Sequence, residues 1–104
     1  MKSIIEWESI VQDYNDVDWS NCNSNDRKEL STTIMEDMET VFANMAELGK
    51  TAEILHDLKL NVQDPSSPEY GQFEDVISQI ESSRKLLRGI TDQLSNKLTI
   101  ARSK

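Results

Sequence analysis

The sequence contains few of the residues that interrupt helices or cross-link chains. Among its 104 residues are one cysteine, two prolines and three glycines. The single cysteine, Cys22, excludes a disulfide bond within the chain and fits a reducing compartment. Because the residues that break helices are scarce, long helices can continue without interruption.

Long apolar runs are also absent. No segment approaches the roughly 20 apolar residues that a membrane-spanning helix needs. The beginning of the chain, MKSIIEWESIVQDY, has one lysine followed by acidic residues, and it lacks the continuous apolar stretch of a signal peptide. We therefore expect a cytoplasmic protein without a membrane partner.

Basic residues are scarce over most of the chain. Residues 1–83 contain 18 acidic and 5 basic side chains, which gives this segment a net charge of −13. Residues 84–104 contain 1 acidic and 6 basic side chains, which gives a net charge of +5. Because an acidic surface repels phosphate groups, we expect no nucleic acid as partner and favour a basic protein or segment.

Apolar residues recur every three or four positions in three segments, which is typical of amphipathic helices. The first segment, residues 2–15, carries its apolar residues on one face: Ile4, Trp7, Ile10, Val11 and Tyr14. The second, residues 26–62, has a narrow heptad-like stripe: Leu30, Ile34, Met38, Val41, Met45, Leu48, Ala52 and Leu55. Because this stripe keeps its register across Gly49, we favour one continuous helix over a break at Gly49 with Thr51 as a new cap.

The third segment, residues 68–102, repeats the pattern with two polar interruptions. Its stripe is Tyr70, Phe73, Ile77, Ile80, Arg84, Leu87, Thr91, Leu94, Leu98 and Ala101. Residues 15–25, rich in Asn, Asp and Ser, form a linker whose composition favours turns and caps. Ser24 or Asn25 is the predicted cap of the second helix.

Both prolines lie in the segment QDPSSPEY, residues 63–70. Pro65 disfavours helical backbone at the residue before it and so ends the second helix. Ser67 and Pro68 are typical of a helix start, with serine as the cap and proline in the first turn. A hinge of residues 63–67 makes the two long helices antiparallel neighbours.

The sequence thus predicts an all-α fold within a single domain, residues 1–104. It is a long antiparallel helical hairpin with a short N-terminal helix, like a three-helix bundle or a coiled coil. The hairpin would bring the basic end of the third segment beside the acidic residues between Asp26 and Glu47. We expect ion pairs between those two helices that fix their orientation.

No residues form a catalytic or metal-binding pattern. His56, the only histidine, is expected beside the apolar stripe or at the surface, and Cys22 lies in acidic surroundings that favour an inert thiol. Residues 16–27 begin like a calcium loop, but Asn21 and Arg27 occupy the positions that require glycine and glutamate. We therefore expect no enzymatic activity, no catalytic residues, no metal and no cofactor.

The remaining pattern favours protein–protein binding. Apolar helix faces framed by acidic residues suit a small subunit, adaptor or chaperone, with apolar side chains giving affinity and charges selecting the partner. The predicted contact residues are Trp7, Trp19, Met38, Phe42 and Met45. The predicted steering residues are Glu36, Asp37 and Glu39. For the N-terminal aromatic residues, the alternative is that they fasten the short helix to the hairpin.

Two other functions remain open at this stage. The acidic surface suits an inhibitor that mimics nucleic acid and occupies a DNA- or RNA-binding protein, and such binding would fall steeply with salt. The narrow stripe also suits self-association, in which the partner is a second copy and oligomers form as concentration rises. The stripe alone leaves open whether the N-terminal helix, a second copy or another protein fills it.

The hinge from Pro65 to Pro68, between two helices, resembles the turn in the needle subunits of type III secretion systems. That resemblance implies a self-assembling helical hairpin subunit of a secretion apparatus. It covers only the hinge and its flanks. This chain is longer, is strongly acidic before Arg84, and lacks the aromatic-rich second helix and tail of that family, so it transfers no residue roles.

Overall fold

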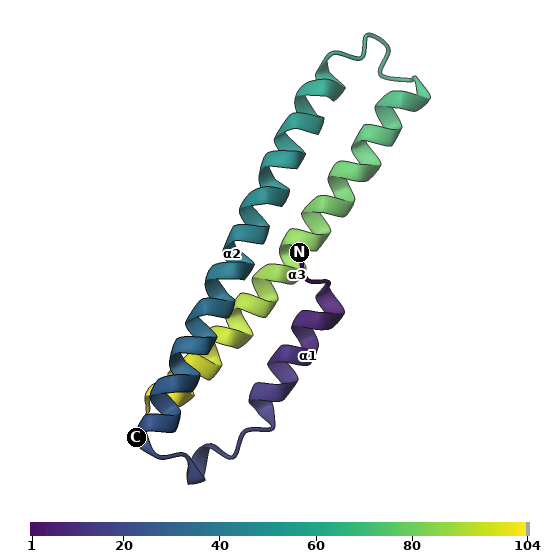
Figure 1. Ribbon diagram of the computed structural model, residues 1–104. Helices are drawn as coiled ribbons and strands as arrows, with labels where there is room; N and C mark the ends of the chain where they lie inside the picture. Colours follow the sequence, from purple (N-terminus) through teal and green to yellow (C-terminus); the bar gives the residue numbers. More distant parts are fainter. Residues whose placement is uncertain (104) are drawn as a thin grey trace.

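The computed structural model describes residues 1–103. It contains three α-helices: α1, Ile4–Asn15; α2, Ser24–Leu60; and α3, Pro68–Arg102. A 3-10 turn, η1 (Trp19–Asn21), lies between α1 and α2. Helices α2 and α3 form a long hairpin, and α1 lies against the half that is farther from the hinge (Figure 1). This arrangement confirms the predicted all-α fold with a helical hairpin.

The hinge is held by short-range hydrogen bonds from its serines. Asp64 Oδ1 accepts hydrogen bonds from the Ser66 N–H at 3.0 Å and from the Ser66 hydroxyl at 2.7 Å. Ser67 Oγ then accepts from the Tyr70 N–H at 3.4 Å and caps α3, with Pro68 in its first turn. The start of α3 is therefore as the sequence predicts, with serine as the cap and proline in the first turn. Helix α2 ends at Leu60, two residues before the predicted end, and its cap is Asn61, so the chain has left the helix before Pro65.

The start of α2 differs from the prediction by one or two residues. Its cap is Asn23 rather than Ser24 or Asn25. Asn23 Oδ1 accepts from the Asp26 N–H at 2.8 Å, and the Asp26 carboxylate accepts in return from the Asn23 N–H at 3.4 Å. This reciprocal capping box satisfies two backbone donors, whereas Ser24 or Asn25 would place the acidic residue out of reach.

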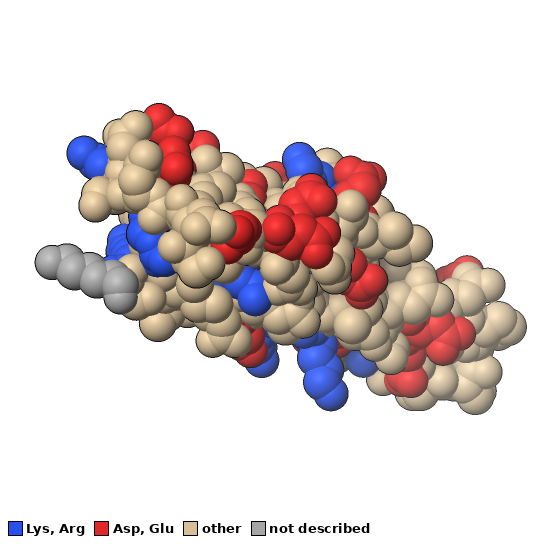
Figure 2. Space-filling view, turned by 90° about the horizontal axis from the view of Figure 1, so that it is seen from below, with Lys and Arg blue, Asp and Glu red and all other residues tan. Residues whose placement is uncertain are grey.

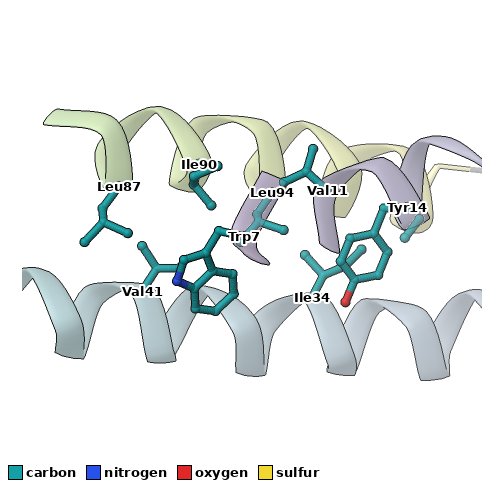
Figure 3. Packing of buried hydrophobic residues seen from close by; sticks show 9 residues of the cluster. Trp7, Val11, Tyr14, Ile34, Val41, Leu87, Ile90 and Leu94 are labelled. Atoms are coloured by element: carbon teal, nitrogen blue, oxygen red, sulfur yellow. The ribbon is translucent and has the colours of Figure 1, made fainter. Parts of the chain in front are cut away.

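The hydrophobic core lies where all three helices meet. Its buried members are Trp7, Val11 and Tyr14 of α1, Ile34 and Val41 of α2, and Leu87, Ile90, Leu94 and Ala101 of α3. Figure 3 shows Trp7 reaching from α1 across to α2, with its indole nitrogen on the side of Val41. Removing a fully buried tryptophan typically costs about 3–5 kcal/mol, so Trp7 anchors α1 to the hairpin.

Gly49 lies inside α2, which is continuous through it, as the unbroken stripe predicts. The Arg84 guanidinium of α3 lies beside this glycine, and a Cβ added to Gly49 would be 3.4 Å from its central carbon. The polar stripe residue Arg84 is therefore accommodated because the facing helix has no side chain at residue 49. Arg84 also pairs with Glu81 of its own helix at 3.5 Å.

Arg27 fastens the open end of the hairpin. Its Nη1 donates to the carbonyl oxygens of Ile100 and Ser103, both at 2.8 Å, at the C-terminal end of α3. Its Nη2 donates to the carbonyl oxygen of Trp19 in η1. One side chain thus joins the linker, the first turn of α2 and the carbonyl oxygens at the C-terminal end of α3, where the Ile100 oxygen also accepts from the Ser103 hydroxyl at 2.8 Å.

The expected ion pairs between α2 and α3 are not formed. Among residues 1–103 the only ion pair is Arg84–Glu81, which lies within α3. Arg102, which was expected to face an acidic residue, instead donates to Met35 Sδ at 3.1 Å. Exposed ion pairs are worth little in water, so apolar packing sets the orientation of the helices here.

Candidate protein-binding surface

Helix α1 covers only part of the hairpin. Its 12 residues span about 18 Å, whereas the molecule is 62 Å long and 18 Å wide. The part of the hairpin beyond α1 consists of residues 45–83, which we call the arm. Ala52 is the only buried residue in the arm, so this segment has two helices but almost no interior of its own.

The arm exposes large apolar side chains on both of its helices. Val76 of α3 is 43% exposed and Leu58 of α2 is 47% exposed. The members of the apolar stripes beside them are only half-buried: Leu55, Phe73, Ile77 and Ile80. Where α1 lies against the same two helices, most of their stripe residues are buried, among them Ile34, Val41 and Leu94. The burial differs because no third helix covers the arm.

Two hollows lie between the helices of the arm. The first has a volume of about 240 Å³ and a largely apolar lining: Leu55, Phe73 and Val76, with Glu69 and Gln72 at its edge. The second, of about 320 Å³, has a polar lining that includes Glu53, His56, Asp57, Glu81 and Arg84. The first hollow is therefore the one suited to an apolar side chain of a partner.

The heptad spacing places the apolar hollow on the same side of the hairpin as α1. On α3, Val76 precedes Ile90 by two heptads, and Ile90 lines a surface hollow together with Ile4 of α1. On α2, Leu58 follows Asp37 by three heptads, and Asp37 bonds to Tyr14 of α1. Residues whole heptads apart face the same side of a paired helix. The arm's apolar hollow thus continues the line of α1.

The arm is acidic. Residues 45–83 contain eight acidic and two basic side chains, a net charge of −6. In Figure 2, the end of the molecule that carries the hinge shows acidic side chains among neutral ones, and no lysine or arginine is visible there on this face. Hydrogen bonds from Ser66 lower the pKa of Asp64, so this hinge carboxylate stays ionised in mildly acidic solution.

The predicted contact residues divide between core and surface. Trp7 is 0% exposed, so its side chain is part of the three-helix core and reaches no partner while α1 is in place. Trp19 is half-buried and donates to the Tyr14 carbonyl oxygen at 3.2 Å. Met38 and Met45 are half-buried against the core, and Phe42 is 53% exposed. Of these five, Phe42 is the most accessible, and it lies just before the arm.

The predicted steering residues lie beside the three-helix part. Glu36 and Glu39 are exposed on α2. Asp37 is half-buried and accepts a hydrogen bond from the Tyr14 hydroxyl, so it helps hold α1. Sequence reasoning missed Leu58 and Val76 as surface residues. The sequence feature that could have identified them is an apolar side chain one position away from the regular stripe. Both residues also lie in a part of the hairpin that the short N-terminal helix cannot reach.

The surroundings of His56 and Cys22 give neither side chain a chemical role. His56 is exposed at the polar hollow of the arm. The Cys22 thiol donates to the Asp18 carbonyl oxygen at 3.4 Å. Within the described part of the chain, no three side chains gather in a way that suits a metal ion. No helix among residues 1–103 combines the length and the apolar character needed to cross a membrane.

Comparisons with protein-family models, with curated proteins and with solved structures give no match.

Proposed function

We propose that this protein is a non-enzymatic binding module that holds a helix of another protein on its arm. The observation that carries the proposal is the change from three helices to two along one hairpin. Where α1 is present, most stripe residues of α2 and α3 are buried, and in the arm beyond it Ala52 is the only buried residue. A partner helix would supply the missing surface.

The exposed apolar area of the arm favours binding. Soluble monomers rarely leave a continuous apolar strip in water, because each Å² of apolar surface buried is worth about 25 cal/mol. Leu58 and Val76 are close to half exposed, and Phe73 beside them is only partly covered. Laying an apolar helix face into the hollow between α2 and α3 is a common mode of peptide recognition.

Self-association and mimicry of nucleic acid remain predictions. Light scattering and the salt dependence of binding distinguish them from the proposed function. A second copy would produce a dimer that grows with concentration in light scattering. A mimic would lose affinity steeply as salt rises, because its contacts are charges at the surface. Binding through the apolar hollow would change little with salt, since apolar burial provides most of the affinity.

The test is photo-crosslinking from single positions in the cells that make the protein. A photoreactive residue replaces Val76 in one variant and Leu58 in another, and the matched control carries it at Ile100. Ile100 is also a partly exposed apolar residue of α3, but it lies outside the arm. We expect one discrete protein adduct from each arm position and none from Ile100.

The other outcomes count against the proposal. Adducts from Ile100 but not from the arm would place the binding surface elsewhere. Adducts with the mass of two copies of the chain would show self-association instead. The absence of any adduct at Val76 and Leu58 would show that no protein occupies the arm in those cells.

A further inference from the structure

The shape and the charge of the arm indicate which kind of helix would bind there and in which direction it would run. We infer that the partner segment is a basic amphipathic helix that lies in line with α1, runs in the same direction as α1 and ends with its C-terminus above Asn44. This inference rests on the proposed function and deepens it. Three features carry it: the face of the hollow, the charge of the arm and the chemistry of the junction where α1 begins.

The side of the arm on which the partner helix would lie follows from the position of α1. The apolar hollow at Leu55, Phe73 and Val76 lies on the α1 side, and the hollow on the opposite side is lined by charged residues such as Glu81 and Arg84. A helix on the α1 side of the arm would meet the heptad positions equivalent to those that α1 meets farther along, as Val76 is equivalent to Ile90. It would extend the three-helix packing without any change in the hairpin.

The charge selects a basic helix. With a net charge of −6, residues 45–83 attract a helix whose flanks carry lysine or arginine beside its apolar face. Two arms placed side by side would repel each other, so the arm of a second copy is a poor occupant. The positively charged end of a second copy is also unsuited, because its stripe residues Leu87, Leu94 and Ala101 are already buried.

The direction follows from the junction between α1 and the arm. Figure 1 shows the N-terminus part-way along the hairpin beside α3, with α1 running from there away from the hinge. The N-terminal end of a helix carries a partial positive charge. The Lys2 ammonium group, 5.7 Å from the centre of the Trp7 ring, adds a full charge there. The Glu6 carboxylate in the first turn of α1 offsets part of this charge. The Lys2 charge and the helix dipole together still favour a neighbour that brings negative partial charge.

Asn44 adds a hydrogen-bond requirement at the same place. It lies on the α1 side one heptad beyond Asp37, is 8% exposed, and its Nδ2 has no hydrogen-bond partner. A buried donor without an acceptor is costly. The C-terminal end of a helix presents carbonyl oxygens without partners and the negative end of the dipole. A partner helix that ends above Asn44 would suit the field, and its carbonyl oxygens would reach the donor, which is buried in the free protein, once the Asn44 amide turns outward. The reverse direction would place two positive ends together.

The test uses a synthetic peptide about four helical turns long, the length of α3 within the arm. Leucines occupy the a and d heptad positions, lysines occupy the others, and both ends are blocked. One version carries a nitroxide spin label at its C-terminus and the other at its N-terminus. Broadening of backbone amide signals in NMR spectra of the full chain then reports which residues each end approaches.

We expect the C-terminal label to broaden the amides of Asn44 and Ile4, and the N-terminal label to broaden those of Ser66 and Tyr70. The reverse pattern, or equal broadening at both places, would overturn the inferred direction while leaving the arm as a binding surface. Equal or tighter binding of a peptide with glutamate in place of lysine would overturn the inferred charge. Binding that broadens only residues outside the arm would overturn the proposed function itself.

A variant pair checks the role of Asn44. Asn44→Asp removes the Nδ2 donor and sets a negative charge against the helix end, so we expect peptide affinity to fall at least about tenfold. The matched control is Asn96→Asp, which makes the same change at an exposed position outside the arm and should leave affinity unchanged. Unchanged affinity in Asn44→Asp would overturn the assigned contact.

A second variant pair keeps the test decisive if Asn44→Asp disturbs the fold. Val76→Lys places a positive charge in the apolar hollow, and Ile100→Lys places one on the same helix outside the arm. Circular dichroism first establishes that both variants remain helical. We expect only Val76→Lys to weaken peptide binding, and equal weakening in the two variants would overturn the location of the site.

Discussion

The Tyr14 hydroxyl donates a hydrogen bond of 2.6 Å to Asp37 Oδ2 and so joins α1 to α2. Both residues are at least half-buried at this contact. Hydrogen bonds to an ionised carboxylate are shorter and stronger than those between neutral groups. The contact therefore helps decide whether α1 stays on the hairpin.

Replacing Tyr14 with phenylalanine should destabilise the protein. Tyr14→Phe removes the donor but keeps the ring in the core, and a hydrogen bond to a charged group is worth about 1.5–3 kcal/mol. The measurement is the free energy of unfolding in urea. Tyr70→Phe is the control, because no hydrogen bond of the Tyr70 hydroxyl is formed within residues 1–103. Equal stability losses in both variants would contradict the role of the contact.

The same phenol should titrate late in alkaline solution. Burial first, and then the hydrogen bond to Asp37, raise the pKa of Tyr14 well above its ordinary value of 10.0. The folded state therefore holds this proton more tightly than the unfolded chain does. Its contribution to stability is complete below pH 10 and is lost as the pH rises beyond that value.

Tyrosinate absorbance, followed as the pH is raised, measures this shift. We expect the late-titrating phenol to be present in the native chain and missing in Tyr14→Phe. A native chain in which both tyrosines ionise together near the ordinary pKa would argue against the buried contact.

Removing Arg27 should loosen the open end of the bundle. Arg27→Ala leaves the carbonyl oxygens of Ile100 and Ser103 without their charged donor, and we expect a loss of about 1–3 kcal/mol in unfolding free energy. Lys28→Ala removes an exposed positive charge from the next position and serves as the control. If the two variants lose the same stability, charge alone rather than the carbonyl contacts explains the effect.

Gly49 offers a test of the packing against Arg84. Alanine is favoured over glycine inside a helix by about 1 kcal/mol, and Gly89→Ala should gain that amount because the new Cβ would meet no atom within 4 Å apart from the surrounding backbone of its own helix and its chain neighbours. Gly49→Ala should gain less, because its Cβ meets the Arg84 guanidinium at 3.4 Å. Thermal unfolding of both variants gives the order. A larger gain at Gly49 would contradict the close approach of Arg84.

The fold could be predicted from the sequence because its signals are local. The stripes in α2 and α3 follow from residue spacing, and the start of α3 follows from the chemistry of Ser67 and Pro68. The cap of α2 was displaced because Ser24, Asn25 and Asn23 are all good caps, and only the reciprocal contact with Asp26 decides among them. The expected ion pairs failed because long charged side chains at the surface gain little from pairing.

The candidate site was less predictable because it depends on which part of the hairpin α1 covers. Trp7 looked like a contact residue from its type, but its place on the buried face of α1 puts it in the core. Val76 and Leu58 lie beside the regular stripes, and they form part of a surface only because α1 does not extend over the arm. Which part of a long hairpin a short helix covers is a tertiary relationship that no spacing rule contains.

Residue-resolved hydrogen exchange of the free protein tests the central claim most directly. Local opening is easiest where few apolar side chains are buried. We predict that helical amides of the arm, residues 45–83, exchange much faster than those of residues 31–41 and 87–101, which face α1. Equal protection along the whole of α2 and α3 would show that two helices suffice in the arm and would remove the reason for a partner there.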